Sequence, residues 1–318
     1  MPRWLAPLML VLATPAGGQQ TERPPPGATP IDPAAAPEPV DPATLLFEQE
    51  ETRMTVPVLV AGAGPYPFIV DTGAQRTVIA RELATTLKLA PGRVVRVTGM
   101  TGSDSIATVL IPSIAVSVIG SAPIEAPAIS AQNLGGLGLL GIDTLQGHAV
   151  GIDFDTRTMT VTPSRKRRRS DREQHDEIIV RARSLFGQLV VTDAYCNGVR
   201  IRVILDTGSP VSMGNAALRQ RVMRKPVRTQ PIALTGVTGQ TVTADYTAID
   251  RVVIGSLTIN NLPIALTATD APPFRQFALI DRPAILLGMD ALTLFRHVDI
   301  DFANREVRLT LPRDGGRR

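Results

Sequence analysis

The segments FIVDTGAQRTVI (residues 68–79) and VILDTGSPVSM (residues 203–213) decide the fold of this chain of 318 residues. Each segment places an Asp-Thr-Gly triplet at the end of an apolar run, and the aspartates Asp71 and Asp206 are 135 positions apart. A glycine two residues after an acid permits a tight turn at the end of a buried strand. The pattern predicts an exposed acid on a buried scaffold in each half of the chain, forming a symmetric pair.

The sequence around each triplet also repeats, in the same order. A hydroxyl residue follows six positions after each aspartate, and then come a Gly-Thr-rich segment, a Leu-Leu-Gly-X-Asp segment and an Ile-Asp-Phe segment. The pairs are Thr77 and Ser212, 98–102 and 235–239, 139–143 and 286–290, and 152–154 and 300–302. A chance triplet would not bring its surroundings with it. We therefore predict two duplicated lobes, at residues 48–163 and 178–312.

Composition indicates that each lobe is mostly antiparallel β-sheet. With 44% hydrophobic and 19% charged residues, each half can bury a core of its own. Short runs rich in Val, Ile and Thr and bounded by turn residues predict strands. These runs span residues 93–98, 106–118, 199–205 and 252–264. Helices are expected only at 80–89 and 215–223, with short turns after Asp143 and Asp290.

The N-terminus has the pattern of a targeting segment. Arg3 precedes an apolar run from Trp4 to Ala13 that ends in small residues through Gly18. This order predicts a secretory signal peptide at residues 1–18, too short to span a bilayer, and hence export to the periplasm or beyond. The alternative is a buried or disordered N-terminal segment. Residues 19–47 are rich in Pro and Ala and predict a flexible tether.

Charge and cysteine content say less about function. The net charge is +4, and much of the excess lies in the basic run 165–169, between the two lobes. Such a run can bind nucleic acid or anionic lipid. Since no aromatic residues are interleaved, we interpret residues 164–177 as a solvated linker and residues 313–318 as a tail, with no nucleic-acid partner. Cys196 has no second cysteine to pair with and predicts a structural thiol before an Asn-Gly turn.

The residue types disfavour most other chemistries. The three histidines do not fall in a metal-binding spacing, and the chain has no GxSxG, GxGxxG or P-loop pattern. Acid–base chemistry by carboxylates is what remains, and we expect neither a metal nor a cofactor.

The compound motif resembles that of clan AA aspartic peptidases, specifically bacterial retropepsin-like proteases with the unit duplicated in one chain. The resemblance rests on the two Asp-Thr-Gly triplets, each paired with a later Leu-Leu-Gly, and covers residues 52–163 and 178–312. It implies a pseudo-symmetric bilobal fold in which Gly141 and Gly288 allow a close approach to the triplet loops. It further implies that Asp143 and Asp290 cap short helices. Two more aspartates would occupy strand positions before a hairpin, namely Asp153 and Asp301.

The resemblance implies a mechanism for the catalytic pair Asp71 and Asp206. Two carboxylates in contact share one proton and activate a water. Around them, the family pattern implies that threonine side chains bond across the interface and that glycine N–H groups point at the acids. These supporting residues are Thr72, Gly73, Thr207 and Gly208.

The two halves differ just after the glycine. Ser209 can donate a hydrogen bond to Asp206, whereas Ala74 has no such donor, so we expect Asp206 to carry more of the shared charge. Pro210 departs from the usual family pattern and removes a backbone donor beside the second site.

The Gly-Thr-rich segments lie where this family has its flap hairpins. The candidate substrate-binding residues there are Gly99, Met100, Thr101, Gly236, Val237 and Thr238. The alternative is a pair of ordinary hairpin turns. Neither tip contains the Tyr of the pepsin flap, which favours the likeness to retropepsins.

Together these observations predict an aspartic endopeptidase that acts on a polypeptide substrate. The mature chain would carry no integral membrane segment and would act as a monomer with its site within one chain. Two alternatives stay open: a catalytically silent peptide-binding module on the same fold, and a domain-exchanged homodimer.

Overall fold

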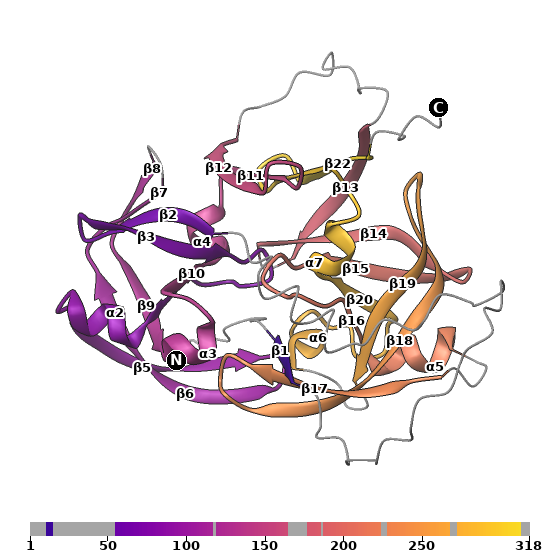
Figure 1. Ribbon diagram of the computed structural model, residues 1–318, viewed down its shortest axis with the longest axis horizontal. Coiled ribbons are helices and arrows are strands. Elements are labelled where there is room, and N and C mark those ends of the chain that lie inside the picture. The colour runs from indigo at the N-terminus through magenta and orange to yellow at the C-terminus, as the bar shows by residue number, and fades with distance from the viewer. Residues whose placement is uncertain are drawn as a thin grey trace, which may run out of the picture.

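The computed structural model describes residues 11–14, 55–116, 119–164, 177–185, 187–223, 228–267 and 272–312. The expected tether, most of the expected signal peptide, nearly all of the basic linker and the tail lie outside these residues. Figure 1 shows two β-rich halves side by side, with long hairpins at one end and a shared sheet at the other. The mostly-β bilobal fold predicted from the sequence is confirmed.

The first half contains eleven of the described strands and three short helices. Its elements are β2 (Thr55–Val60), β3 (Ala63–Val70), β4 (Val78–Ala80), α2 (Arg81–Thr86), β5 (Ala90–Gly99), β6 (Gly102–Ile111), β7 (Ile114–Val116), β8 (Ile119–Ser121), β9 (Ile124–Ile129), α3 (Ala131–Leu134), β10 (Gly138–Leu140), α4 (Ile142–Leu145), β11 (His148–Asp153) and β12 (Thr158–Pro163). In β2, buried and exposed residues alternate, as expected for a strand with one face on the core.

The second half repeats this order. Its elements are β13 (Glu177–Leu185), β14 (Gln188–Cys196), β15 (Val199–Leu205), β16 (Met213–Gly214), α5 (Ala216–Val222), β17 (Gln230–Gly236), β18 (Thr241–Ile254), β19 (Leu257–Thr267), α6 (Pro272–Gln276), β20 (Ala284–Leu287), α7 (Met289–Leu292), β21 (His297–Asp301) and β22 (Glu306–Thr310). The triplet strands are β3 and β15, and the paired hairpins are β5–β6 and β17–β18. The duplication read from the sequence is therefore also structural.

Each Leu-Leu-Gly strand threads between the triplet strand and the strand after it. β10 runs parallel to β3 and antiparallel to β4, and β20 runs parallel to β15 and antiparallel to β16. The backbone N–H groups of Asp71 and Asp206 donate to the carbonyls of Leu140 and Leu287, both at 3.0 Å. These bonds fix both acids at the end of a buried parallel strand pair.

The glycine after each of these strands passes very close to the triplet loop. A Cβ placed on Gly141 would lie 2.3 Å from the carbonyl carbon of Arg76, and one on Gly288 would lie 2.6 Å from that of Val211. No side chain can occupy such a gap without moving backbone. The close approach predicted for both glycines is confirmed.

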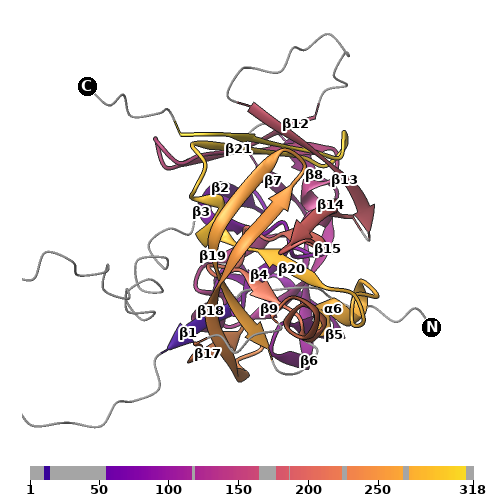
Figure 2. The same cartoon turned by 90° about the vertical axis from the view of Figure 1, so that its right-hand side faces the viewer.

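A shared sheet joins the two halves. β11 of the first half pairs antiparallel with β21 of the second, from Ala149 opposite Asp301 to Asp153 opposite His297. The full order of this part is β14-β13-β22-β21-β11-β12, within a sheet of thirteen strands. In Figure 2, β12 and β21 of this part lie at the end of the molecule away from β6 and β17. Asp153 and Asp301 end their strands before hairpin turns, as predicted.

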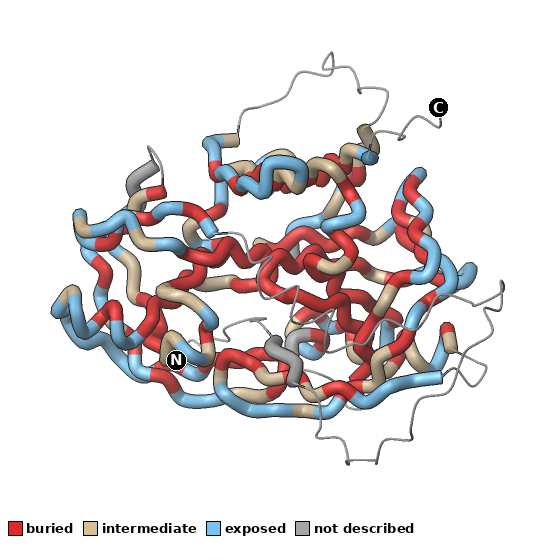
Figure 3. The backbone as a smooth tube through the Cα atoms, viewed as in Figure 1, coloured by how far each residue is buried: buried red, intermediate tan, exposed pale blue. Residues whose placement is uncertain are grey.

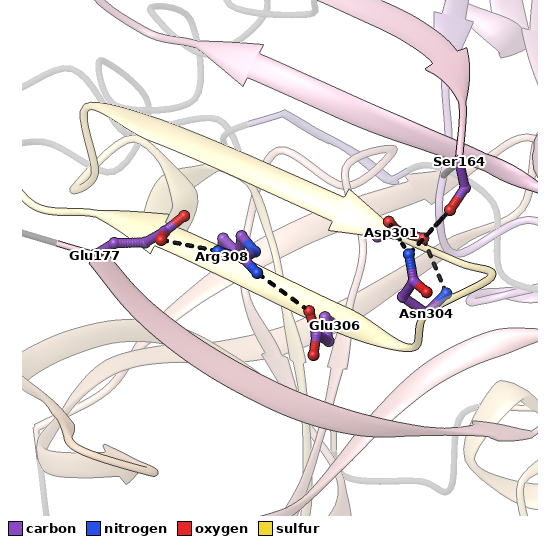
Figure 4. A network of polar contacts seen from close by, with 6 residues as sticks. All are labelled: Ser164, Glu177, Asp301, Asn304, Glu306 and Arg308. Atoms are coloured by element: carbon purple, nitrogen blue, oxygen red, sulfur yellow. Dashed lines mark hydrogen bonds and ion pairs between the residues drawn. The ribbon is translucent and has the colours of Figure 1, made fainter. Parts of the chain in front are cut away.

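Polar side chains reinforce the shared sheet (Figure 4). The Ser164 hydroxyl donates to Asp301 across the halves at 2.7 Å, and Asn304 donates to the same carboxylate from its amide at 2.7 Å. Nearby, the largely buried Arg308 guanidinium contacts Glu177 at 2.9 Å and Glu306 at 3.5 Å. Asp301 is therefore structural, holding the end of one half on the other.

The buried backbone is continuous through the middle of the molecule, where the triplet strands meet (Figure 3). Some boundaries differ from the sequence prediction. The run 106–118 is broken between β6 and β7, and the run 252–264 is broken at Gly255, a glycine with φ of +57°. Both runs contain turn-forming residues at the breaks, Pro112 and Ser113 in the first and Gly255 and Ser256 in the second.

The apolar N-terminal run contributes one described strand. β1 (Val11–Thr14) pairs antiparallel with β17, from Val11 opposite Gly236 to Thr14 opposite Ala233. The signal peptide at residues 1–18 stays a prediction. Within the described residues, no helix is long and apolar enough to cross a membrane.

The packing around Gly288 predicts the effect of adding a methyl group. We expect Gly288→Ala to lower the free energy of unfolding by about 3 kcal/mol, because the new Cβ would overlap backbone atoms of the triplet loop. Gly255→Ala is the control: no atom lies within 4 Å of its Cβ, so only the left-handed backbone costs energy, about 1 kcal/mol. Urea unfolding measures both, and equal losses would contradict this account of the close approach.

Candidate active site

The two triplets, 135 positions apart in the sequence, meet at the centre of the molecule. A Cβ on Gly73 would lie 2.6 Å from Oδ1 of Asp206, and a Cβ on Gly208 would lie 2.2 Å from Cγ of Asp71. Each carboxyl group thus lies against the glycine of the opposite triplet. Only glycine leaves room for the acid of the other half at this position.

Threonine side chains lock the two loops together. Each backbone N–H of Thr72 and Thr207 donates to the hydroxyl of the other threonine, both at 3.1 Å. The Thr72 hydroxyl donates to the Leu205 carbonyl at 3.0 Å, and the Thr207 hydroxyl donates to the Val70 carbonyl at 2.7 Å. The structure brings these two residues together as the sequence predicted.

Each acid also accepts hydrogen bonds from its own loop. Oδ1 of Asp71 accepts from the N–H groups of Gly73 at 2.8 Å and Ala74 at 2.9 Å, and Oδ1 of Asp206 accepts from Gly208 at 3.1 Å. Such donors stabilise the ionised form of a carboxyl group.

The expectation that both acids are exposed is wrong, because Asp71 is 0% and Asp206 is 1% exposed. Burial is the largest cause that raises the pKa of both groups. The charge of Asp206 adds to it and raises the pKa of Asp71 well above its usual range, while the pKa of Asp206 rises to about 6. The pair therefore favours a singly protonated state.

The expected bond from the Ser209 hydroxyl to Asp206 is not formed. That hydroxyl instead donates to the Val211 carbonyl at 2.7 Å, because the turn at Pro210 brings this acceptor within reach two residues on. Burial still raises the pKa of Asp206, and a hydrogen bond from the Asp71 carboxyl and the backbone N–H groups of Gly208 and Ser209 oppose that rise.

Pro210 does not disturb the match between the two loops. In the first half, the carbonyls of Ala74 and Gln75 accept from α4 at 2.8 and 3.2 Å. In the second half, the carbonyls of Ser209 and Pro210 accept from α7 at 2.9 and 3.2 Å. The proline stands where the loop contributes a carbonyl, so its missing N–H costs none of these bonds.

Asp143 and Asp290 do not cap their helices, because Gly141 and Gly288 occupy the N-cap positions. Asp143 accepts from both the N–H and the hydroxyl of Thr77, each at 2.8 Å. Asp290 accepts from the N–H of Ser212 at 2.9 Å and from its hydroxyl at 2.6 Å.

The hydroxyls of Thr77 and Ser212 in turn accept from the N–H groups of the close-packed glycines, Gly141 at 3.1 Å and Gly288 at 3.0 Å. Both aspartates therefore tie a triplet loop to its Leu-Leu-Gly strand. The sequence carried a signal for this role, since the hydroxyl residue and the acid recur at matching places in both repeats.

The two hairpin tips meet. The tip of β5–β6 is the turn of Met100 and Thr101 between Gly99 and Gly102, and its side chains are buried. A Cβ on Gly236, in the other tip, would lie 2.2 Å from the Thr101 hydroxyl.

Each tip also packs onto the opposite half. Met100 belongs to an apolar cluster of second-half residues that includes Phe274 and Phe277. On the other side, a Cβ on Gly239 would lie 3.0 Å from the amide nitrogen of Asn133 in α3. Val237 is fully buried, whereas Thr238 is only half-buried. The structure thus places all six predicted tip residues in two touching turns.

One residue beside the pair Asp71 and Asp206 was not predicted from the sequence. Gln188, at the start of β14, is fully buried, and its side-chain amide donates to the Gly73 carbonyl. It lies outside every repeated motif, so no pattern in the sequence marked it.

Comparison with known families agrees with this geometry. Residues 56–147 match a family described as gag-polyprotein putative aspartyl protease, and residues 192–291 match one described as aspartyl protease. The chain is a retropepsin-like aspartic protease of clan AA by family. Each match contains one Asp-Thr-Gly triplet and one Leu-Leu-Gly segment, so this protein carries the family unit twice.

A similar solved structure is the crystal structure of a retropepsin-like aspartic protease from Rickettsia conorii. It is 23% identical, covers 42% of this chain and 89% of its own, and has a TM-score of 0.30. None of the curated proteins matches the chain.

The buried carboxyl of Asp290 predicts a pH dependence of stability. Burial raises its pKa from 3.8 to about 6, so the folded state keeps the proton up to a higher pH than the unfolded state does. The stability that it contributes is complete below pH 4 and is lost as the pH rises through 6. Two pKa units correspond to about 3 kcal/mol.

We expect Asp290→Asn to reduce the difference in unfolding free energy between acid and neutral pH by about 3 kcal/mol, because the amide stays neutral and can still accept from Ser212, while the other buried carboxyl groups keep their own contributions. Urea unfolding at pH 4 and pH 7 measures it. Asp250→Asn, the same change at an exposed carboxylate, should keep the wild-type slope. A wild-type slope in Asp290→Asn would refute a titrating Asp290.

Proposed function

We propose that this protein is an aspartic endopeptidase that hydrolyses peptide bonds with a water activated between Asp71 and Asp206. The observation that carries the proposal is the facing pair of buried carboxyl groups, each against the glycine of the opposite triplet. Two acids in contact destabilise each other and raise a pKa, which a binding surface has no need of. A hydrolase that shares one proton between them uses that instability.

The reaction follows from the singly protonated state. The ionised carboxylate, Asp206, takes a proton from water as the water oxygen bonds to the scissile carbonyl carbon. The protonated acid, Asp71, gives its proton to the carbonyl oxygen. Transfer of a proton from Asp206 to the amide nitrogen then breaks the C–N bond, and a hydroxyl of the tetrahedral carbon returns a proton to Asp71 as the new carboxylic acid forms. The pair regains its single proton, and no acyl-enzyme is needed.

The touching hairpin tips supply the cover that this chemistry needs. Residues 99–101 and 236–238 would separate to admit a peptide and close over it, excluding bulk water. In each tip, a glycine and a threonine offer backbone and hydroxyl groups to an extended substrate. We propose a polypeptide substrate for this reason, and export of the protein from its N-terminal sequence.

The dyad predicts the effect of neutralising either acid. We expect Asp71→Asn and Asp206→Asn each to lower kcat/KM by roughly 10³-fold or more, since general acid–base catalysis is lost while the fold is kept. The measurement is digestion of a mixed peptide library from acidic to neutral pH, with mass spectrometry of the products. A pepstatin-type inhibitor should abolish the wild-type activity.

Asp250→Asn again serves as the matched control and should cleave as the wild type does. Cleavage that persists in Asp71→Asn would disprove the dyad mechanism. An intact fold that binds the inhibitor but cleaves nothing at any pH would instead indicate the silent peptide-binding module.

A site assembled within one chain predicts that activity does not depend on association. We expect the specific activity to stay constant over a hundredfold dilution, with a sedimentation coefficient of a monomer. Loss of activity on dilution, together with a dimer in the concentrated sample, would favour the domain-exchanged homodimer.

A further inference from the structure

Gln188 reaches the first triplet from the second half of the chain. It begins β14 just after the turn of the β13–β14 hairpin, and none of its surface is exposed. Gly187 beside it has φ of +91°, and a Cβ there would lie 2.8 Å from Cγ2 of Ile142 and 3.2 Å from Nε2 of Gln146. The hairpin of one half therefore packs against α4 of the other, next to the Asp71 loop.

The amide of Gln188 completes a chain of hydrogen bonds that ends on the acid. It donates to the carbonyl of Gly73. That carbonyl and the N–H of Ala74 belong to one peptide unit, and this N–H donates to Oδ1 of Asp71 at 2.9 Å. A donor on the carbonyl oxygen polarises the peptide and strengthens its N–H as a donor.

The same contact fixes the orientation of that peptide plane. The next carbonyl, of Ala74, is held by the N–H of Ile142 in α4 at 2.8 Å. With Gln188 on the Gly73 carbonyl and α4 on the Ala74 carbonyl, the intervening N–H cannot turn away from Asp71. The side chain is also neutral, so it supports the anion without adding a charge to the pair.

We propose that Gln188 is a positioning residue for Asp71, holding the Gly73–Ala74 peptide so that its N–H points at the acid; the proposal rests on the proposed function. It reaches the acid only through the backbone. Among the described residues, Asp206 is the charged group that acts on Asp71. Arg76 lies farther along the same loop, and Asp143, in α4, binds Thr77 of that loop. Gln188, a residue of the second half, thus influences the hydrogen bonding of Asp71 in the first half.

The test compares Gln188→Met, which keeps the length but has no donor, with Gln188→Glu. We expect Gln188→Met to lower kcat about tenfold with KM changed less than twofold, because the loop loses its orientation. The alkaline limb of the pH profile should move up by about half a pH unit, since the anion of Asp71 loses support.

A buried Glu stays protonated in acid and can donate its O–H to the same carbonyl. Gln188→Glu should therefore outperform Gln188→Met at acid pH and lose that advantage as it ionises. Gln220→Met, the same change at an exposed position on α5, is the control and should match the wild type.

A second readout does not depend on turnover. Carboxyl ¹³C resonances of labelled aspartates, assigned with Asp71→Asn and Asp206→Asn, report the titration of Asp71 directly. We expect its midpoint to rise in Gln188→Met by the same half unit. If the wild type cleaves nothing, the proposed function fails, yet this titration still tests Gln188.

Two results would overturn the proposal. One is a Gln188→Met protein with wild-type kcat and wild-type Asp71 titration. The other is Gln188→Glu performing worse than Gln188→Met at acid pH, as expected if the site merely prefers an apolar side chain. Should Gln188→Met fail to fold, as judged by thermal unfolding, the comparison of Gln188→Glu with the wild type across pH decides.

Discussion

The structure depends on one constraint: two buried carboxyl groups must be held in contact although they repel when both are ionised. The crossed hydrogen bonds of Thr72 and Thr207 meet this constraint, because each threonine bonds both the backbone N–H of its counterpart and a carbonyl of the opposite strand. All these atoms are buried, so breaking these hydrogen bonds would leave several polar groups without partners. The two loops therefore hold each other in place, and neither can move alone.

Contacts with the Leu-Leu-Gly strands extend this rigidity into each half. Behind each loop stands a Leu-Leu-Gly strand whose glycine touches loop backbone and whose aspartate binds the hydroxyl residue of that loop. Burying Asp143 and Asp290 costs stability when they ionise, since burial raises the pKa of both. The same acids orient the loops in which catalysis would occur. Stability at neutral pH and precise loop geometry thus oppose each other in this fold.

The sequence predicted what repetition and local chemistry determine. Both triplets, both close glycines and the hairpin tips follow from the matching order of motifs. The prediction that Asp143 and Asp290 cap helices was wrong. A short helix beside an acid suggests capping, but these carboxylates instead bind hydroxyl groups that lie 66 and 78 positions away in the sequence. The prediction that the Ser209 hydroxyl donates to Asp206 was also wrong, since it donates to the Val211 carbonyl instead. Gln188 could not be predicted, because its partner lies 115 positions away and no repeat marks it.

Duplication within one chain lets the two halves become different. A site made of two identical chains presents the same residues to both acids, so only substrate can decide which acid is ionised. Here Ala74 stands opposite Ser209, and Gln188 supports the loop of Asp71 from the second half. Burial raises the pKa of both acids, and the charge of Asp206 adds to this rise at Asp71, whereas the support from Gln188 acts on Asp71 in the opposite sense. A protease built this way can assign the base and the acid in advance, and substrate binding need not supply the energy of breaking the symmetry.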